Sequence, residues 1–332
     1  MLKFSEATLA SDMKRSSDGG MIELIDASFK GRLKILAPIY SVLCVLLSLS
    51  MGSALQARAA IESTLTGNLN EKAPTLIFTA LVALAIFGGA SRIEKFTSFL
   101  IPIATVSYIA LTLAVILLNF SRLPLVFIEI IQDAFSLKAG LGGISAFVIA
   151  SKMREGFSRG LLSNEAGAGT SAFAHTRNDS AGTLAGLVGM CEVFFDTVVL
   201  CMLTAFAVLL AVPSPESFSS GIEIVFYAIS SLGAFAQPLL SFSIFAFAYS
   251  TVICWYYYGK SALSHLAKSC TFIFSVIFLL CVFFGATTPS AILIVISDYV
   301  LFFLTAISLF TVIKNSDRLV CLSEMGGLIT KF

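Results

Sequence analysis

The sequence predicts an all-α polytopic membrane protein, and three observations lead to this fold class. The 332 residues are 57% hydrophobic and 12% charged, and the mean hydropathy of +0.94 lies well above that of soluble domains. Several windows hold about 20 apolar residues with almost no charge, the length that a helix needs to cross a hydrocarbon core of about 30 Å. These windows lack the period-two alternation of membrane β-barrel strands, so helices must satisfy the backbone groups in lipid.

Seven apolar windows follow one another along the chain. We predict membrane spans at residues 33–57, 74–90, 99–118, 181–212, 235–258, 269–286 and 290–313. The spans and the segments between them form a transmembrane domain over residues 33–313, and residues 314–332 form a cytoplasmic tail. Between the third and fourth windows lies a segment of mixed polarity, residues 140–176.

Basic residues in the loops predict the topology. If residues 140–176 cross the bilayer once, the loops on the side of the amino terminus hold fourteen Lys and Arg residues and the opposite loops hold four. Without that crossing, Lys260 and Lys268 change sides and the asymmetry is lost. Since basic loops are typically cytoplasmic, and residues 1–32 lack the apolar core of a signal peptide, we expect a multi-pass protein of the cell membrane whose amino terminus is cytoplasmic.

Composition also argues against several classes of function. The net charge of +1 and the lack of a basic patch predict no binding of nucleic acid. The seven cysteines show no metal-ligand spacing and are expected to pack as small apolar residues. His175 and His265 are expected in or near solvated inside loops, without a catalytic partner, so we predict that the protein is not an enzyme and has no cofactor.

The stretch GLLSNEAGAGTSAF, residues 160–173, predicts a break in a membrane helix. An ordinary helix would place Asn164 and Glu165 in hydrocarbon, at a cost of several kcal/mol for the charged group. Gly160, Gly167 and Gly169 also lower helix propensity. On polarity alone, a plain loop between helices remains open, but the asymmetry of the basic residues favours a crossing. Broken helices in secondary transporters expose backbone groups that bind ions and substrates.

Five stretches resemble the alanine or glycine:cation symporter family, also called the sodium:alanine symporter family. RGLLSNEAGAGTSA (159–172) resembles its signature R-G-L-F-S-N-E-A-G-M-G-S-A-P. FFDTVVLCMLTA (194–205) and FAFAYSTVICWYYYGK (245–260) resemble its F-x-D-T-x-x-x-C-x-x-T-A and F-A-F-S-T-x-x-G-W-x-Y-Y-G-E helices. MGSALQARA (51–59) and the stretch at 87–108 resemble its G-N-x-x-Q-x-N and G-G-x-x-R-I-A segments.

The resemblance implies the amino-acid transporter fold, a five-plus-five inverted repeat, incomplete at the amino terminus. Residues 1–32 resemble the cytoplasmic end of a family helix and its loop, and the helices that precede it in the family have no counterpart here. The implied function is sodium-coupled, or proton-coupled, symport of alanine or glycine, with a separately encoded amino-terminal fragment as a partner. The alternative is a transport-inactive chain that acts at most as a membrane binding or scaffold subunit.

The resemblance also implies the residues of a substrate site. Amides near Ala166, Gly167 and Gly169 would bind the substrate carboxylate, and carbonyls around Ser163 to Glu165 its ammonium. Trp255 would cover its small side chain. The full set of expected substrate-binding residues is Gln56, Ser163, Asn164, Glu165, Ala166, Gly167, Gly169 and Trp255. Ala168, where the signature has methionine, would widen the pocket slightly.

Sodium coupling would require oxygen ligands, and the helix before Trp255 offers them. The resemblance points to the hydroxyls of Ser250 and Thr251 with the carbonyl of Phe247 or Ala248. The residues alone favour another reading, in which these hydroxyls bond back to carbonyls of their own helix. Three further residues are expected to have structural or gating roles: Asp196, Thr197 and Asp298.

Overall fold

The protein is helical throughout the part of the chain that the structure describes. The computed structural model describes residues 1–12, 20–64, 71–88, 90–135, 153, 156, 160, 164–175, 182–213, 217–218 and 220–325, and these residues contain no β-strand. Six of their helical runs are long and apolar enough to cross a membrane: Gly31–Thr64, Thr97–Leu118, Gly182–Ala211, Ala236–Leu266, Lys268–Gly285 and Ala291–Lys314. The predicted fold class, an all-α polytopic membrane protein, is confirmed.

Six of the seven predicted spans correspond to these runs, and the seventh corresponds to a helix that is shorter than a candidate span. The window at 74–90 corresponds to the 17-residue helix α5 (Lys72–Gly88), which falls below the length of the six candidate spans. The window at 99–118 lies within a longer helix, α6 (Ala90–Leu118), which contains Pro102. Helix α6 begins before the apolar window does. Charged residues in its first turns end the apolar window but do not end the helix.

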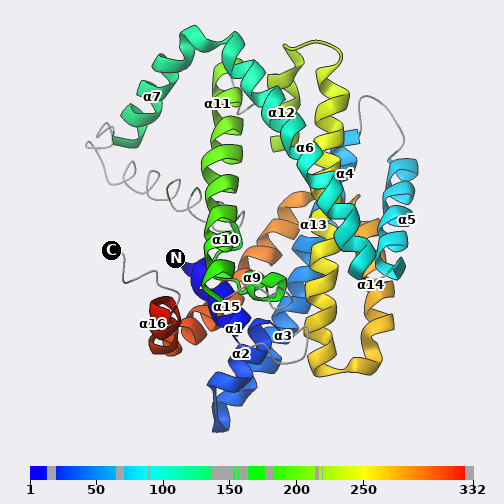
Figure 1. Cartoon of the computed structure of the whole chain (residues 1–332). Coiled ribbons are helices and arrows are strands. Elements are labelled where there is room, and N and C mark those ends of the chain that lie inside the picture. Colours follow the sequence, from blue (N-terminus) through cyan, green and yellow to red (C-terminus); the bar gives the residue numbers. More distant parts are fainter. Residues whose placement is uncertain are drawn as a thin grey trace, which may run out of the picture. The chain divides into compact units, whose positions relative to one another are not determined.

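The chain divides into two compact units, which we describe separately. The first contains Met1–Ile101, Glu165–Phe194 and Phe245–Phe332, and the second contains Pro102–Asn164 and Phe195–Ile244. The remaining helices of the first unit are α1 (Leu2–Asp12), α2 (Met21–Ser28), η1 (Gly31–Ile35), α3 (Leu36–Leu47), η2 (Ser48–Leu55), α4 (Gln56–Thr64), α9 (Thr170–His175), α10 (Gly182–Phe194), η7 (Lys268–Cys270), α14 (Thr271–Gly285), α15 (Ser290–Lys314) and α16 (Ser316–Met325) (Figure 1). The second half of α13 (Ala236–Leu266) completes it.

A buried hydrophobic cluster of the first unit lies between α4, α5, α13 and α14. It contains Phe78, Tyr256 and Phe278, together with small residues such as Ala57 and Ala60. The Tyr256 ring packs edge-on against Phe278 at 5.3 Å between centroids, and its hydroxyl is within hydrogen-bonding distance of a serine on α14. Helices α13 and α14 run antiparallel around this cluster, joined by the short turn η7 (Figure 1). Aromatic packing thus fixes the carboxyl-terminal half of α13, which carries Trp255.

Helix α1 packs closely against α9 and α10 (Figure 1). Gly186 of α10 makes the close approach possible, since a Cβ there would collide with the Thr8 hydroxyl and come within 2.6 Å of the Phe4 ring. Small residues at helix contacts are typical of membrane proteins, where van der Waals packing replaces the hydrophobic effect. This packing holds the amino-terminal helix beside the segment that contains Glu165–Gly169.

The second unit consists of the carboxyl-terminal part of α6, η3 (Phe120–Arg122), α7 (Leu123–Phe135), η5 (Phe195–Cys201), α11 (Met202–Ala211), α12 (Gly221–Ser230) and the first part of α13. Helix α11 contacts both α7 and α12. The hydroxyls of Tyr108 and Thr204 lie 2.7 Å apart, and Arg122 donates a hydrogen bond to the carbonyl of Leu210 at 3.0 Å. These polar contacts connect α6 and the following turn to α11.

In the part of the chain that the structure describes, two helical runs contain a π-helical segment. η2 (Ser48–Leu55) separates α3 from α4, and η5 (Phe195–Cys201) separates α10 from α11. π-helical turns are rare and often lie at functional sites. Predicted site residues lie beside one segment and within the other: Gln56 directly follows η2, while Asp196 and Thr197 lie within η5.

Candidate functional site

A non-helical turn precedes the short helix α9 and forms the centre of the candidate site. Residues 165–169, hereafter the Glu165 turn, have three positive φ angles: 50° at Glu165, 90° at Gly167 and 83° at Gly169. The amide of Ala168 donates a hydrogen bond to the carbonyl of Glu165 at 3.1 Å. Glycine adopts positive φ at little cost, whereas Glu165 does so at an energetic penalty that its surroundings must offset. The expected site residues Gly167 and Gly169 therefore have a conformational reason to be glycine.

Trp255 holds the side chain of Glu165. Its indole Nε1 donates a hydrogen bond to Glu165 Oε1 at 3.0 Å, and the tryptophan is 1% exposed. The ring lies against η2, because a Cβ at Gly52 would collide with the Cβ of Trp255. It also packs edge-on against Tyr258, with 5.6 Å between ring centroids. Two of the expected substrate-binding residues, Glu165 and Trp255, are thus brought together.

Helix α3 and helix α2 support the other end of the Glu165 turn. The buried hydroxyl of Tyr40 donates a hydrogen bond to the carbonyl of Ala168 at 2.6 Å. A Cβ at Gly169 would collide with that hydroxyl and approach Met21 Cγ to 2.8 Å. Gly169 is therefore required both by its positive φ and by the space available. The residue motif predicted the turn, but nothing in the sequence indicated that Tyr40 supports it.

A second carboxyl group, Glu6 of α1, also contacts the Glu165 turn. The Gly169 amide donates a hydrogen bond to Glu6 Oε1 at 3.1 Å, and Ser308 of α15 donates another at 3.2 Å. Glu6 is fully buried, and α1 is not one of the candidate spans. Burial raises the pKa of Glu6 to about 7, against the lowering effects of Lys3 and of the two hydrogen bonds. The sequence signal for this residue was a single acid within a run of small and apolar residues, SEATLA.

The remaining expected substrate residues lie in several places. Ser163 is outside the described residues, and Asn164 belongs to the second unit. There its Oδ1 accepts a hydrogen bond from the hydroxyl of Thr197 at 2.7 Å, so two residues from separate motifs meet. Ala166 lies within the Glu165 turn and is half-buried. Gln56, also half-buried, begins α4 four residues after Gly52, the residue that contacts Trp255.

The expected cation ligands lie on α13 one turn before Trp255. The Ser250 hydroxyl donates to the carbonyls of Ala246 and Phe247, both at 2.9 Å, and the Thr251 hydroxyl donates to Phe247 at 2.8 Å. This is the back-bonded arrangement that the residues alone favoured. The bonds use the hydroxyl hydrogens and leave oxygen lone pairs for a hard cation. Ala248, the other expected carbonyl ligand, is buried in the same helix.

Two acids and one histidine complete the comparison with the sequence predictions. Asp196 and Asp298 are half-buried, within η5 and α15 respectively. The expectation that His175 is solvated is wrong: at the end of α9 it is 4% exposed, and its Nε2 lies 3.8 Å from Glu192 Oε1. Burial lowers the pKa of His175, while Glu192 acts in the opposite direction. Its interior position follows from the contact between α9 and α1, which the sequence does not reveal.

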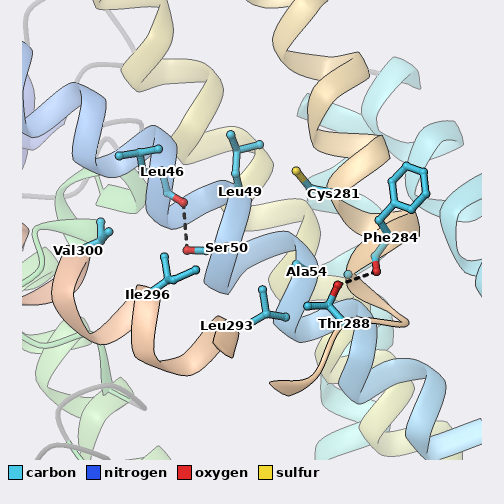
Figure 2. Close-up of a pocket in the computed structure, with 11 residues that line it drawn as sticks. Leu46, Leu49, Ser50, Ala54, Cys281, Phe284, Thr288, Leu293, Ile296 and Val300 are labelled. Atoms are coloured by element: carbon cyan, nitrogen blue, oxygen red, sulfur yellow. Dashed lines mark hydrogen bonds between the residues drawn. The ribbon is translucent and has the colours of Figure 1, made fainter. Parts of the chain in front are cut away.

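A separate apolar cavity of about 350 Å³ lies beside η2 in the first unit (Figure 2). Its walls come from η2, α14 and α15 and include Leu49, Phe284 and Ile296. Ser50 and Thr288 line it, but their hydroxyls donate to the carbonyls of Leu46 and Phe284, four residues earlier, as the dashed lines in Figure 2 show. The cavity therefore offers a ligand an almost wholly apolar wall. It contains none of the expected site residues.

Within the described residues, no group of three or more His, Cys, Asp or Glu side chains could hold a metal ion. The polar groups of the site are instead a turn of backbone, two carboxyl groups, an indole and hydroxyls. Such a set suits a small zwitterion or a hard monovalent cation better than a transition metal.

Comparison with known proteins identifies relatives that are membrane transporters. The sequence pattern of the sodium:alanine symporter family matches residues 2–321. A transporter of Haemophilus influenzae that carries no functional name is 29% identical over 330 residues, covering 94% of this chain and 67% of its own length. The amino-acid carrier protein AlsT of Bacillus subtilis is 30% identical over 240 residues, covering 70% of this chain and 50% of its own length.

An archaeal relative has a more specific name. The sodium/alanine symporter AgcS of Methanococcus maripaludis is 26% identical over 301 residues, which cover 86% of this chain and 65% of AgcS. The chain thus spans between half and two thirds of the length of these relatives.

Proposed function

Because the chain belongs to the sodium:alanine symporter family, we propose that it takes part in sodium-coupled symport of a small neutral amino acid, alanine or glycine, across the cell membrane. The relatives named as an amino-acid carrier and as a sodium/alanine symporter support the class of substrate and the coupling ion. The Glu165 turn carries the proposal, since it is a partly buried break in the helical structure, lined by polar groups and bonded to the indole of Trp255.

In this proposal, a zwitterionic substrate binds at the Glu165 turn. Backbone amides near Ala166, Gly167 and Gly169 bind the carboxylate, and carbonyls from Ser163 to Glu165 bind the ammonium group. Trp255 packs on the small side chain and limits its size. The hydrogen bond from the Trp255 indole to Glu165 supports this role, because it fixes the ring plane beside the turn.

The coupling cation binds on α13, close in sequence to Trp255. Ser250 and Thr251 contribute hydroxyl oxygens, and Phe247 or Ala248 contributes a carbonyl oxygen. Phe247 already accepts hydrogen bonds from both hydroxyls, so a bound cation must compete with them. That competition predicts weak cation binding, which a transporter needs if it is to release the ion.

The test is uptake of labelled alanine or glycine into proteoliposomes under an imposed sodium gradient. One arm contains this chain alone, and a second adds, as a separate polypeptide, the part of AgcS that this chain does not match. A third replaces the sodium gradient by a proton gradient, which identifies the coupling ion. We expect sodium-dependent uptake in at least one of the first two arms.

The fluorescence of Trp255, the single tryptophan, gives an independent measure of binding. Binding without uptake in either arm would favour the alternative of a transport-inactive binding subunit. Neither binding nor uptake would contradict the proposal. Thr251→Val should abolish sodium stimulation while the protein still inserts, and Thr271→Val, at the start of α14, is the matched control.

A further inference from the structure

Among the carboxyl groups whose burial the structure describes, Glu6 alone is fully buried. Its Oε1 accepts hydrogen bonds from the Gly169 amide at 3.1 Å and from the Ser308 hydroxyl at 3.2 Å. Its Oε2 is buried and has no hydrogen-bond partner among the described residues. An ionised carboxylate with one unpaired buried oxygen is unstable relative to its neutral form. The geometry therefore favours a carboxyl group that can bind a proton.

The partner of Glu6 is an amide of the Glu165 turn. Gly169 cannot move aside easily, because Tyr40 and Met21 fill the space where its Cβ would be. Glu6 is thus a protein carboxylate bound to one of the amides that were expected to bind a substrate carboxylate. Its charge state determines how strongly this amide is held, since hydrogen bonds to an ionised acceptor are roughly twice as strong as neutral ones.

The charges around Glu6 shift its pKa in both directions. Lys3, three residues away in the sequence and on the same helix, favours the ionised form, while Glu165 opposes it. The elements packed against α1 are α2, α9, α10, α15 and α16. Together with α1, α3 and the Glu165 turn, they carry these other titratable and charged groups: Lys3, Asp12, Glu23, Asp26, Tyr40, Cys44, Glu165, His175, Cys191, Glu192, Asp298, Tyr299, Lys314, Asp317, Arg318, Cys321 and Glu324. Asp12 and Arg318 form an ion pair with each other, so their charges largely cancel.

We propose that Glu6 is a proton-binding site whose charge state controls the Glu165 turn. The proton comes from solvent and forms an O–H bond at Oε2, because Oε1 already accepts two hydrogen bonds. Protonation removes the negative charge next to Gly169 and weakens the bond to its amide. Deprotonation strengthens that bond and holds the turn as the structure shows it. No other reactant takes part.

Trp255 reports the state of this turn. Its indole is bonded to Glu165, four residues before the Gly169 amide that Glu6 holds, and it is the single tryptophan of the chain. The inference does not depend on symport, since proton binding is measured without substrate or uptake. It can therefore hold if the proposed function fails, and it can fail while the proposed function holds.

The experiment titrates the full chain in detergent or nanodiscs between about pH 5 and about pH 9. Infrared difference spectra record the carboxylic acid C=O band, and tryptophan fluorescence records the turn. For the native protein we expect both signals to change with a midpoint near pH 7, where burial places the pKa of Glu6. Glu6→Gln should remove both transitions. Glu62→Gln, the same change on α4, should keep them.

Two further variants keep the test decisive if Glu6→Gln does not fold. Lys3 and Ser308 both lower the pKa of Glu6, so Lys3→Met and Ser308→Ala should each move the midpoint to higher pH. The proposal is overturned if Glu6→Gln keeps the transition, or if the native protein shows none above about pH 5, the range of ordinary carboxyl groups. Unchanged midpoints in both Lys3→Met and Ser308→Ala would overturn it equally.

Discussion

Gly169→Ala tests whether the Glu165 turn is as tightly constrained as its contacts indicate. The residue has φ of 83°, and left-handed backbone costs a residue with a side chain roughly 1–2 kcal/mol. The new methyl group would also collide with the Tyr40 hydroxyl and approach Met21 Cγ to 2.8 Å. Overpacking of this kind typically costs a further 1–3 kcal/mol or so. We therefore expect a loss of about 2–5 kcal/mol in the free energy of unfolding.

Thermal unfolding in detergent, followed by tryptophan fluorescence, measures this loss. For a chain of this size, the expected change lowers Tm by roughly 5–15 °C. Gly221→Ala is the matched control, because a Cβ at Gly221 meets nothing within 4 Å and the residue lies in the first turn of α12. This control should change Tm by only a few degrees.

A double variant identifies the cause of the loss. Tyr40→Phe removes the hydroxyl that the new methyl group meets, at a cost of about 1 kcal/mol for the lost hydrogen bond to Ala168. With Gly169→Ala, it should destabilise the protein by less than the sum of the two changes. The reasoning is refuted if Gly169→Ala unfolds no more easily than Gly221→Ala, or if the two changes are strictly additive.

Three other outcomes follow from the same contacts. Trp255→Phe keeps an aromatic ring but removes the indole bond to Glu165, and should weaken alanine binding by roughly 10-fold, measured by equilibrium binding of labelled substrate. Burial raises the pKa of Glu6 from 4.5 to about 7, so as pH rises the unfolded chain releases this proton before the folded protein does. The free energy of unfolding should therefore fall by about 3 kcal/mol between pH 4.5 and about pH 7. Denaturant titrations at several pH values measure that slope, which Glu6→Gln should remove. Asn164→Leu breaks the hydrogen bond from Thr197 and should abolish coupled uptake without preventing insertion; normal uptake would exclude the amide from the mechanism.

The membrane-spanning helices could be predicted because hydropathy depends on local composition. The predicted apolar windows ended at charged residues, whereas a helix can continue through them. Helix α6 includes Arg92, Glu94 and Lys95 in its first turns, although the predicted span began at residue 99. Helix α5 is apolar enough for a span, but at 17 residues it is shorter than the six candidate spans.

The π-helical segments could not be predicted. In the sequence SLSMGSAL, small and apolar residues alternate without a face that distinguishes a helical period of 3.6 residues from a wider one. The close contacts of η2 with α13 and with the end of α14 are not visible in its sequence. Gly52 lies against Trp255, and Ala54 lies against Gly285, where a Cβ would collide with the backbone. Such packing is a property of the folded chain.

The candidate site shows the same division between local and distant signals. The glycines and polar residues of 160–173 predicted a break in the helix because their conformational preferences are local. Its partners are distant: Tyr40 is 128 residues from Ala168, and Glu6 is 163 residues from Gly169 and 302 from Ser308. Only the packing of α1, α3 and α15 around the turn brings them together.

These distant partners change how a ligand must bind. In the folded protein, the Ala168 carbonyl, the Gly169 amide and the Glu165 carboxylate are each bonded to a protein group. An amino acid that entered the turn would therefore exchange hydrogen bonds with Tyr40, Glu6 and Trp255 rather than satisfy vacant groups. Exchange of similar bonds yields little net free energy, so differences in charge decide the balance. If a substrate carboxylate binds the Gly169 amide as proposed, it would compete with Glu6 most easily when Glu6 is neutral, so proton binding at Glu6 would favour substrate binding at this turn.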